Sequence, residues 1–218
     1  MSGSVIKLIE QYKIVAIIRG LYGPALLNLA AALYAGGIRL LEVTFDQSDP
    51  DCLRKTPAAI AELRERLGED MRFGAGTVLS AEQAKAAGRA GAEFIISPDT
   101  KAAVVETTKA MGLVSIPAGM TPTEILRAHE LGADMVKVFP AAWLGLSWFK
   151  DIRSPVNHVP MMATGGVSEE NLGAYLAAGY AAAGIGGRLT DKNLIALGRF
   201  DELTKRAAAC VRAAEAAN

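Results

Sequence analysis

Two charged residues stand in segments that otherwise read as apolar strands. Glu42 lies in the run RLLEVTF and Lys137 in the run ADMVKVF. Side chains alternate between the two faces of a strand, so Lys137 is expected to point inward if Met135 and Phe139 do. A buried charge is costly unless it is paired or neutralised. The simplest structural interpretation is a buried Lys–Glu ion pair that only fills the interior of the protein.

The chemical alternative is an amine that burial makes nucleophilic. Desolvation lowers the pKa of a lysine, so that a useful fraction of the amine is neutral and attacks a ketone to form a Schiff base. The iminium then acts as an electron sink, and Glu42 is the obvious group to carry protons at that centre. We favour this interpretation because interior positions of parallel barrels are usually branched aliphatic residues.

Two glycine-rich turns point to an anion site. They follow the last two expected strands and read Thr164-Gly165-Gly166 and Gly186-Gly187-Arg188. Glycine is needed where backbone N–H groups approach an anion closely, and phosphate sites of barrels often occupy this position. Arg188 or Arg19 is a candidate to add positive charge. The structural alternative is that the glycines only form tight turns and that the arginines are solvated.

The elements that must position these residues alternate along the chain. Short apolar runs of β type are separated by Ala-rich stretches with an apolar period near 3.6 residues, which predicts helices. The eight expected strands are Ile14–Ile18, Leu40–Thr44, Arg72–Ala75, Phe94–Ser97, Leu113–Ile116, Met135–Phe139, Val159–Ala163 and Ala181–Ile185. Strict alternation of strand and helix predicts a parallel sheet with helices outside it.

Eight such units in 218 residues predict one (β/α)₈ barrel domain over residues 1–218. A doubly wound open sheet is the alternative, and the barrel is favoured because no long edge strand or change in composition divides the chain. Helices expected at Gly3–Lys13 and Leu194–Ala217 are candidates to cover an end of the barrel. In such barrels catalytic groups lie at the carboxyl ends of the strands, where the residues discussed above are found.

Composition argues against several classes of function. The chain has 23 basic and 23 acidic residues and 6% aromatic residues, so neither a basic field nor a stacking surface for nucleic acid is expected. Two cysteines and two histidines rule out a disulfide framework and a Cys- or His-rich metal site. With neither a signal-peptide pattern nor an apolar run of about 18 residues, we expect a cytoplasmic protein without a membrane partner.

The motifs taken together resemble a known family. IVAIIRG, LEVTF, FGAGTVLSAEQ, AEFIISPDT, IPAGMTPTEI, MVKVFPA, ATGGVSEEN and GIGGRL follow in order from about Ile14 to Leu189. This combination is similar to the 2-keto-3-deoxy-6-phosphogluconate (KDPG) and 4-hydroxy-2-oxoglutarate (KHG) aldolases. The resemblance implies a class I lyase on a (β/α)₈ barrel, usually a homotrimer. It implies no metal and no cofactor beyond a lysine Schiff base with the keto acid substrate, which is cleaved to pyruvate and glyceraldehyde 3-phosphate or glyoxylate.

The resemblance also assigns roles to residues. It places the Schiff-base lysine at Lys137 and the general acid/base at Glu42. Thr77 matches a threonine that helps to hold the pyruvate carboxylate. Pro98 matches the proline after the fourth strand, and Phe139 matches the aromatic residue near the Schiff base. The matched phosphate-loop positions are Thr164, Gly165, Gly166, Gly186 and Gly187.

Two positions depart from the family pattern. Asp46 stands where typical members have an arginine that holds the pyruvate carboxylate, so either Arg19 supplies the charge or the preferred substrate differs. Arg188 stands where typical members have a phosphate-binding serine. An arginine there would bind phosphate in place of the serine or accommodate a carboxylate instead. A related pyruvate aldolase with a non-phosphorylated acceptor therefore remains an alternative.

Three further hypotheses compete with this one. Another phosphate-binding barrel, such as a thiamin-phosphate or indole-pathway synthase, would share the glycine turns but would not need Lys137 to form an imine. A non-catalytic barrel that binds sugar acids would explain Asp46 but not the intact Glu42, Thr77 and Lys137. A metal-dependent class II aldolase is disfavoured because no His, Asp and Glu residues cluster at the expected strand ends.

Overall fold

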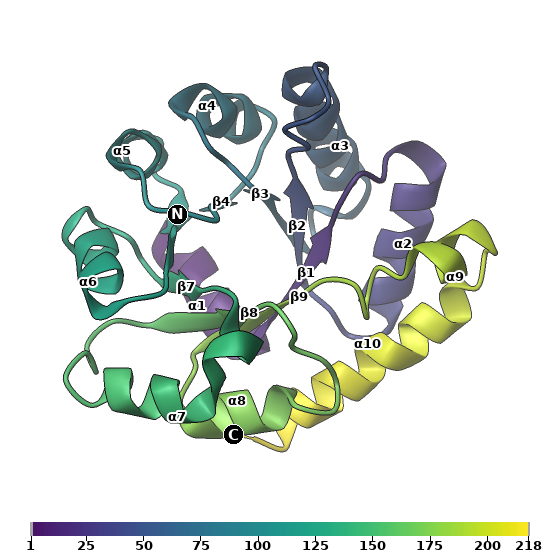
Figure 1. The fold of residues 1–218 in the computed structure, drawn as a ribbon. Helices are drawn as coiled ribbons and strands as arrows, with labels where there is room; N and C mark the ends of the chain where they lie inside the picture. The colour runs from purple at the N-terminus through teal and green to yellow at the C-terminus, as the bar shows by residue number, and fades with distance from the viewer. Residues whose placement is uncertain (1, 218) are drawn as a thin grey trace.

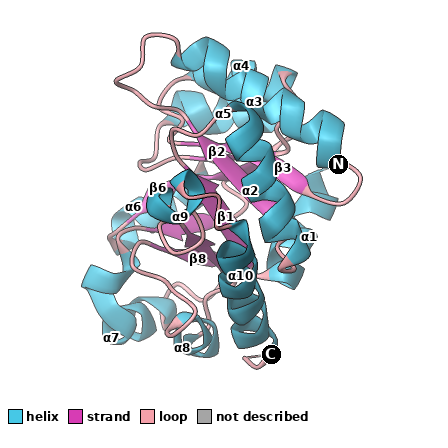
Figure 2. Ribbon diagram, turned by 90° about the vertical axis from the view of Figure 1, so that its right-hand side faces the viewer, coloured by secondary structure: helices cyan, strands magenta, loops and turns pink. Residues whose placement is uncertain are grey.

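Parallel strands form a nearly closed barrel with helices around its outside (Figures 1 and 2). The computed structural model describes residues 2–217. The strands are β1 (Ile14–Ile18), β2 (Leu40–Thr44), β3 (Arg72–Gly76), β4 (Phe94–Ile96), β5 (Val114–Ile116), β6 (Ala118–Gly119), β7 (Val136–Val138), β8 (Met161–Thr164) and β9 (Ala182–Ile185). Their order is β5-β4-β3-β2-β1-β9-β8-β7-β6, and every pair is parallel. The predicted barrel is confirmed, and the doubly wound open sheet is wrong.

Helices follow the strands in the predicted alternation. They are α1 (Ser2–Tyr12), α2 (Gly23–Ala35), α3 (Cys52–Leu67), α4 (Ala81–Arg89), α5 (Ala102–Ala110), α6 (Pro122–Glu130), α7 (Ala141–Arg153), α8 (Leu172–Ala178), α9 (Lys192–Ala196) and α10 (Phe200–Glu215). Among the residues described, no helix is long and apolar enough to cross a membrane.

The predicted fifth strand, Leu113–Ile116, corresponds to β5, and the structure adds a short segment, β6, that was not predicted and begins just after Pro117. Proline has no N–H to donate to a neighbouring strand, so the ladder is interrupted there. The segment before it, β5, pairs with β4, and the segment after it, β6, pairs with β7. The Pro117 carbonyl still accepts a hydrogen bond from the Lys137 N–H at 2.9 Å. The fifth strand thus contacts its two neighbours in succession, which explains why the sheet has nine segments where eight strands were expected.

The helix boundaries carry the expected local signals. At the start of α6 the Thr121 hydroxyl accepts from the Glu124 N–H, while the Glu124 carboxylate accepts from the Thr121 N–H at 2.8 Å. This capping box, with Pro122 in the first turn, satisfies N–H groups that the helix itself leaves unpaired. At the other end of a helix, α8 stops at Gly179, whose φ of 109° is readily adopted only by glycine.

The inside of the barrel is closed at one end by α1. Val5 and Ile9 of this helix pack against the buried side chains that point inward from the strands. Those inward side chains are Val15, Leu40, Phe94, Ile96, Val114, Ile116, Met135, Met162 and Ala182. The prediction that the first helix covers an end of the barrel is therefore confirmed, and the site must open at the opposite end, which faces the viewer in Figure 1.

The last helix does not cover an end, so that part of the prediction is wrong. The expected helix Leu194–Ala217 is two helices, α9 and α10, separated by Gly198 with a φ of 67°. The second of them packs outside the barrel against α2, where the Thr204 hydroxyl donates to the Ala32 carbonyl at 3.0 Å. Its buried residues are Leu203, Ala207, Cys210 and Ala214. Figure 2 shows the helix along the outside of the barrel.

Candidate active site

The barrel interior becomes polar one layer above the apolar side chains that pack against α1. Glu42 on β2 and Lys137 on β7 are both buried, with 1% and 3% of their surfaces exposed. In the strand register, Glu42 lies beside Ile17 and Gly74, and Lys137 lies beside Ala118 and Met162. Since β1, β9 and β8 separate the two strands, the carboxyl and the amine approach one another from across the barrel. Each residue follows by two positions a member of the interior cluster, Leu40 or Met135, so both point inward, as was predicted for Lys137.

Space for the Glu42 carboxyl is left by a glycine on the neighbouring strand. A Cβ built on Gly76 would overlap Oε1 of Glu42. Two residues earlier on the same face, a Cβ built on Gly74 would overlap the ring of Phe94. Sequence reasoning did not assign these glycines a role in the site. Their spacing of two in the strand FGAG, which places both on one face, was the available signal.

The buried ion pair considered as a structural interpretation is not formed. Neither carboxylate oxygen of Glu42 has a hydrogen-bond partner among the described residues. The Lys137 Nζ instead lies 5.0 Å from the centroid of the Phe139 ring. Two buried polar groups that are close enough to influence each other but are not bonded are costly for folding alone. Their arrangement suits a site in which a third molecule makes the missing contacts.

Burial pushes both groups toward their neutral forms. Desolvation lowers the pKa of Lys137, the nearby Arg19 cation acts in the same direction, and Glu42 opposes the shift. Desolvation also raises the pKa of the Glu42 carboxyl, against the influence of Lys137 and Arg19. The layer therefore favours an uncharged amine, which is nucleophilic, next to a protonated acid, which donates a proton.

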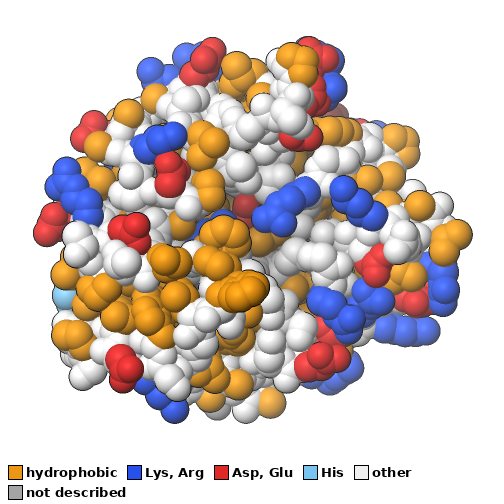
Figure 3. Space-filling model, viewed as in Figure 1, with side chains coloured by type: hydrophobic (Ala, Val, Ile, Leu, Met, Phe, Trp, Pro, Cys, Tyr) orange, Lys and Arg blue, Asp and Glu red, His pale blue; other side chains and the backbone are white. Residues whose placement is uncertain are grey.

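A cavity of about 450 Å³ opens next to Phe139, and the two glycine-rich turns line it. The Thr164 hydroxyl oxygen, at its edge, is buried and has no hydrogen-bond partner in the described part of the chain. The predicted site residues that line this cavity are Arg19, Phe139, Thr164, Gly165, Gly166, Gly186, Gly187 and Arg188. Figure 3 shows basic side chains around the hollow near the middle of this face. The structure thus brings eight of the predicted residues to one place.

Two smaller cavities adjoin the first. Arg19 also borders a cavity of about 330 Å³ that contains Thr77 and Asp46. Phe139 also borders a cavity of about 380 Å³ that contains Pro98. All the predicted site residues therefore lie at the open end of the barrel, and Arg19 and Phe139 are shared between neighbouring cavities.

The surroundings of Asp46 contain residues that sequence reasoning missed. The Asp46 carboxylate accepts hydrogen bonds from the N–H and hydroxyl of Ser48, which hold it in the loop after β2. Lys192, from the start of α9, lines the same cavity. Gln47 donates to the Thr77 carbonyl at 2.8 Å and so supports a residue whose φ is 54°. No local sequence signal marks Lys192, because only barrel closure brings it next to the second strand.

The comparisons with known proteins agree with this geometry. The family model described as KDPG and KHG aldolase matches residues 5–206. The chain belongs to this aldolase family. The interpretation as a different phosphate-binding synthase is therefore wrong.

Family members of known activity resemble the chain over most of its length. It is 38% identical over 177 residues to the 2-dehydro-3-deoxy-phosphogluconate aldolase of Treponema pallidum, covering 81% of each chain. It is 31% identical over 177 residues to the 2-dehydro-3-deoxy-6-phosphogalactonate aldolase of Escherichia coli, covering 81% of this chain and 83% of the relative. A KDPG aldolase from Legionella pneumophila, solved with pyruvate captured at low pH as a covalent carbinolamine intermediate, superposes with a TM-score of 0.83. It is 27% identical, and the match covers 94% of this chain and 97% of that one.

Proposed function

We propose that this aldolase cleaves a 2-keto-3-deoxy-6-phospho sugar acid, or 4-hydroxy-2-oxoglutarate, into pyruvate and an aldehyde through a Schiff base on Lys137. The observation that carries the proposal is the Lys137–Glu42 pair: buried, unbonded to one another and shifted toward neutral forms at the open end of the barrel. The names of the relatives support the substrate class, and the covalent pyruvate adduct of the Legionella enzyme supports the class of mechanism.

In the first stage the neutral Lys137 amine attacks the C2 ketone of the substrate. The protonated Glu42 carboxyl then gives its proton to the carbinolamine hydroxyl, which leaves as water and produces the iminium. Burial assists both steps, because it lowers the pKa of the amine and raises that of the acid.

In the second stage Glu42, now a carboxylate, takes the proton of the C4 hydroxyl, directly or through one water. The C3–C4 bond breaks, its electron pair moves into the iminium, and the aldehyde leaves behind an enamine of pyruvate. Glu42 returns the proton to C3 and is left as a carboxylate. Water hydrolyses the resulting iminium to pyruvate and the free amine, and the proton released in this step goes back to Glu42. The iminium supplies the electron sink, so the proposed reaction needs no metal and no organic cofactor.

The remaining predicted residues bind the two ends of the substrate. Arg19 and Thr77 border the cavity that contains Asp46, and we propose that they hold the carboxylate in place of the arginine that Asp46 replaces. Pro98 and Phe139 are proposed to pack against the pyruvate part. The phosphate is proposed to lie in the larger cavity, where Arg188, the Thr164 hydroxyl and backbone N–H groups of the turns at Gly165, Gly166, Gly186 and Gly187 meet.

Borohydride trapping tests the proposed chemistry. The protein is reduced with sodium borohydride in the presence of pyruvate, and modified peptides are identified by mass spectrometry. We expect an adduct on Lys137 in the wild type and in the surface control Lys85→Ala, and none at that position in Lys137→Ala. Binding of pyruvate without an adduct on any lysine would contradict the proposal and favour a barrel that binds sugar acids without turnover.

We also propose that the chain forms a homotrimer, as the members of this family usually do. Trp143 in α7 is 90% exposed, which is unusual for so large an apolar side chain on the surface of a monomer. Size-exclusion chromatography with light scattering tests the proposal, which predicts three times the 22.9 kDa mass of the chain. A mass equal to one chain would contradict it.

A further inference from the structure

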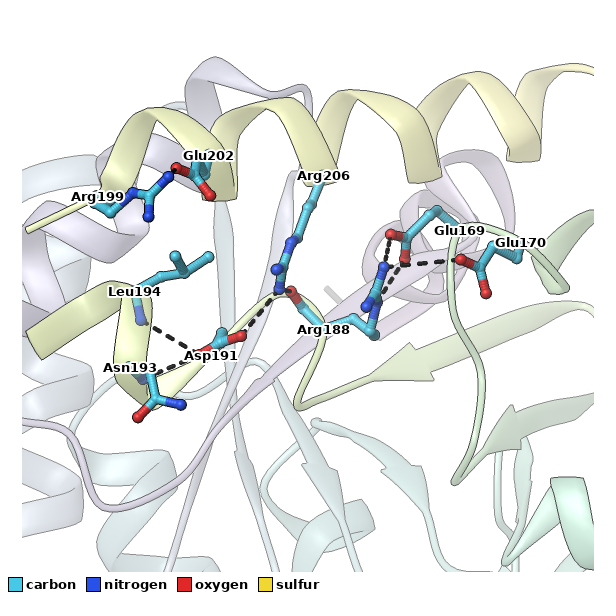
Figure 4. A network of polar contacts seen from close by, with 9 residues as sticks. All are labelled: Glu169, Glu170, Arg188, Asp191, Asn193, Leu194, Arg199, Glu202 and Arg206. Atoms are coloured by element: carbon cyan, nitrogen blue, oxygen red, sulfur yellow. Dashed lines mark hydrogen bonds and ion pairs between the residues drawn. The ribbon is translucent and has the colours of Figure 1, made fainter. Parts of the chain in front are cut away.

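An ion pair that sequence reasoning did not foresee joins the two glycine-rich turns. Arg188 follows the turn after β9, and Glu169 follows the turn after β8. The Arg188 Nε donates to Glu169 Oε2 at 3.1 Å, and its Nη2 donates to Glu169 Oε1 (Figure 4). Two parallel bonds of this kind fix the orientation of a guanidinium as well as its position. The pair therefore connects both walls of the larger cavity.

The two partners differ in their relation to the cavity. Arg188 lines it and its side chain is 46% exposed, whereas Glu169 does not line it and its side chain is 16% exposed. The carboxylate thus binds the guanidinium from the side away from the cavity. Both bonds to Glu169 use Nε and Nη2, and no described residue accepts from Nη1. A donor on Arg188 consequently stays available to a further anion.

The backbone of Arg188 is held as firmly as its side chain. Arg206 of α10 donates to the Arg188 carbonyl at 3.1 Å and to Asp191 Oδ2 at 3.2 Å (Figure 4). The other oxygen of Asp191 accepts from the Asn193 N–H at 3.0 Å and so caps α9. A long, partly exposed arginine ordinarily loses rotamer freedom when it binds an anion. Here the fold has already restricted that freedom, which lowers the entropic cost of binding.

We propose that Glu169 is a positioning residue that acts through Arg188 to make the enzyme select substrates with a distal phosphate. This inference rests on the proposed function, because it assumes that the substrate extends from Lys137 into the larger cavity. A phosphate can accept bonds from Arg188 and from the backbone N–H groups of the turns at once, while a hydroxyl in its place offers Arg188 no charge. The position that departs from the family pattern is then a specificity determinant.

Steady-state kinetics of four variants test the inference. The variants are Arg188→Ala, Glu169→Gln, the double variant, and Glu170→Gln as a matched control. Glu170 also approaches Arg188, at 3.9 Å, but its side chain is 80% exposed. Each is assayed with the better of KDPG and its galactonate epimer, and with the same compound without its phosphate. Adduct formation with pyruvate at Lys137 is measured in parallel.

We expect Arg188→Ala to raise the KM for the phosphorylated substrate about tenfold or more, with little change in kcat. We expect Glu169→Gln to raise the same KM about threefold, because the guanidinium is no longer held. Both should leave the KM for the dephosphorylated substrate unchanged, and Glu170→Gln should behave as wild type. In the double variant, loss of Glu169 should add nothing to the loss of Arg188.

Three outcomes would overturn the inference. A lower KM for the phosphorylated substrate in Glu169→Gln would mean that the carboxylate competes with the phosphate for Arg188. Identical behaviour of Glu169→Gln and Glu170→Gln would reduce the pair to an ordinary surface ion pair. Equal KM increases for both substrates would indicate a general distortion of the cavity. Absence of the Lys137 adduct in the wild type would instead contradict the proposed function, so the two failures are distinguishable.

Discussion

Met135, just before β7, and Lys137, on β7, both point into the barrel and yet have opposite surroundings. Met135 lies in the closed layer, where α1 and the inward side chains of the other strands surround it with apolar contacts. Lys137 lies in the next layer, near a carboxyl without bonding partners and near Phe139, which lines the cavity of about 450 Å³. The apolar side chains of the closed layer pack against one another. The polar groups of the layer above lack hydrogen-bond partners, which a bound substrate would supply.

Two glycines of β3 repeat the contrast. Gly74 makes room for the ring of Phe94 in the closed layer, and Gly76 makes room for the Glu42 carboxyl in the open layer. The same residue type thus serves packing at one position and chemistry at the next. The difference shows that the function of an interior position in this barrel depends on its height above α1 more than on its strand.

The largest expected effect comes from exchanging side chains between the two layers. Lys137→Met should abolish turnover while the free energy of unfolding stays the same or increases, since a buried amine is replaced by an apolar chain of similar length. Met135→Lys should destabilise the fold by about 3 kcal/mol or more, because the closed layer offers an ammonium no partner. Urea unfolding and steady-state turnover measure the two quantities. Equal stability losses in both variants would contradict the distinction between the layers.

A smaller effect on turnover and stability is expected when a glycine of either layer is replaced by alanine, which adds one methyl group. Gly76→Ala should displace the Glu42 carboxyl and lower kcat about 100-fold, because a catalytic group misplaced by about 1 Å loses this much rate. Gly74→Ala, the matched control, should instead cost about 1–3 kcal/mol of stability through overpacking against Phe94. Its kcat per folded molecule should change far less. The comparison fails if Gly74→Ala lowers kcat as much as Gly76→Ala does.

The smallest effect concerns the two neighbouring charges that shift the pKa of the Lys137 amine. Glu42 raises this pKa and Arg19 lowers it, so Glu42→Gln should lower the pKa and Arg19→Gln should raise it. In the wild type the neutral amine should form with a midpoint below the ordinary lysine value of 10.5. The measurement is the pH dependence of reductive methylation at Lys137, followed by peptide mass spectrometry. If the pKa of Lys137 shifted in the same direction in both variants, altered burial rather than the neighbouring charges would control this pKa.

Much of the fold and of the site followed from local patterns. The apolar runs located the strands to within one or two residues, since a buried strand must be apolar along its length. Glu42 and Lys137 were recognisable because a charge in such a run is costly and demands an explanation. The added segment β6 was less visible, although Pro117 was the signal, because a single missing N–H acts only when a neighbouring strand requires it.

The sequence by itself determined the succession of strands and helices, the family, and which side chains carry charge into the barrel. Only the tertiary structure decided that Glu42 and Lys137 are not bonded, that Lys192 reaches the cavity of Asp46, and that Glu169 holds Arg188. The physical reason is one of range. Periodicity and capping depend on neighbours within a few residues of the chain. The contacts of Glu42, Lys192 and Glu169 depend instead on which strands lie next to one another in the closed barrel.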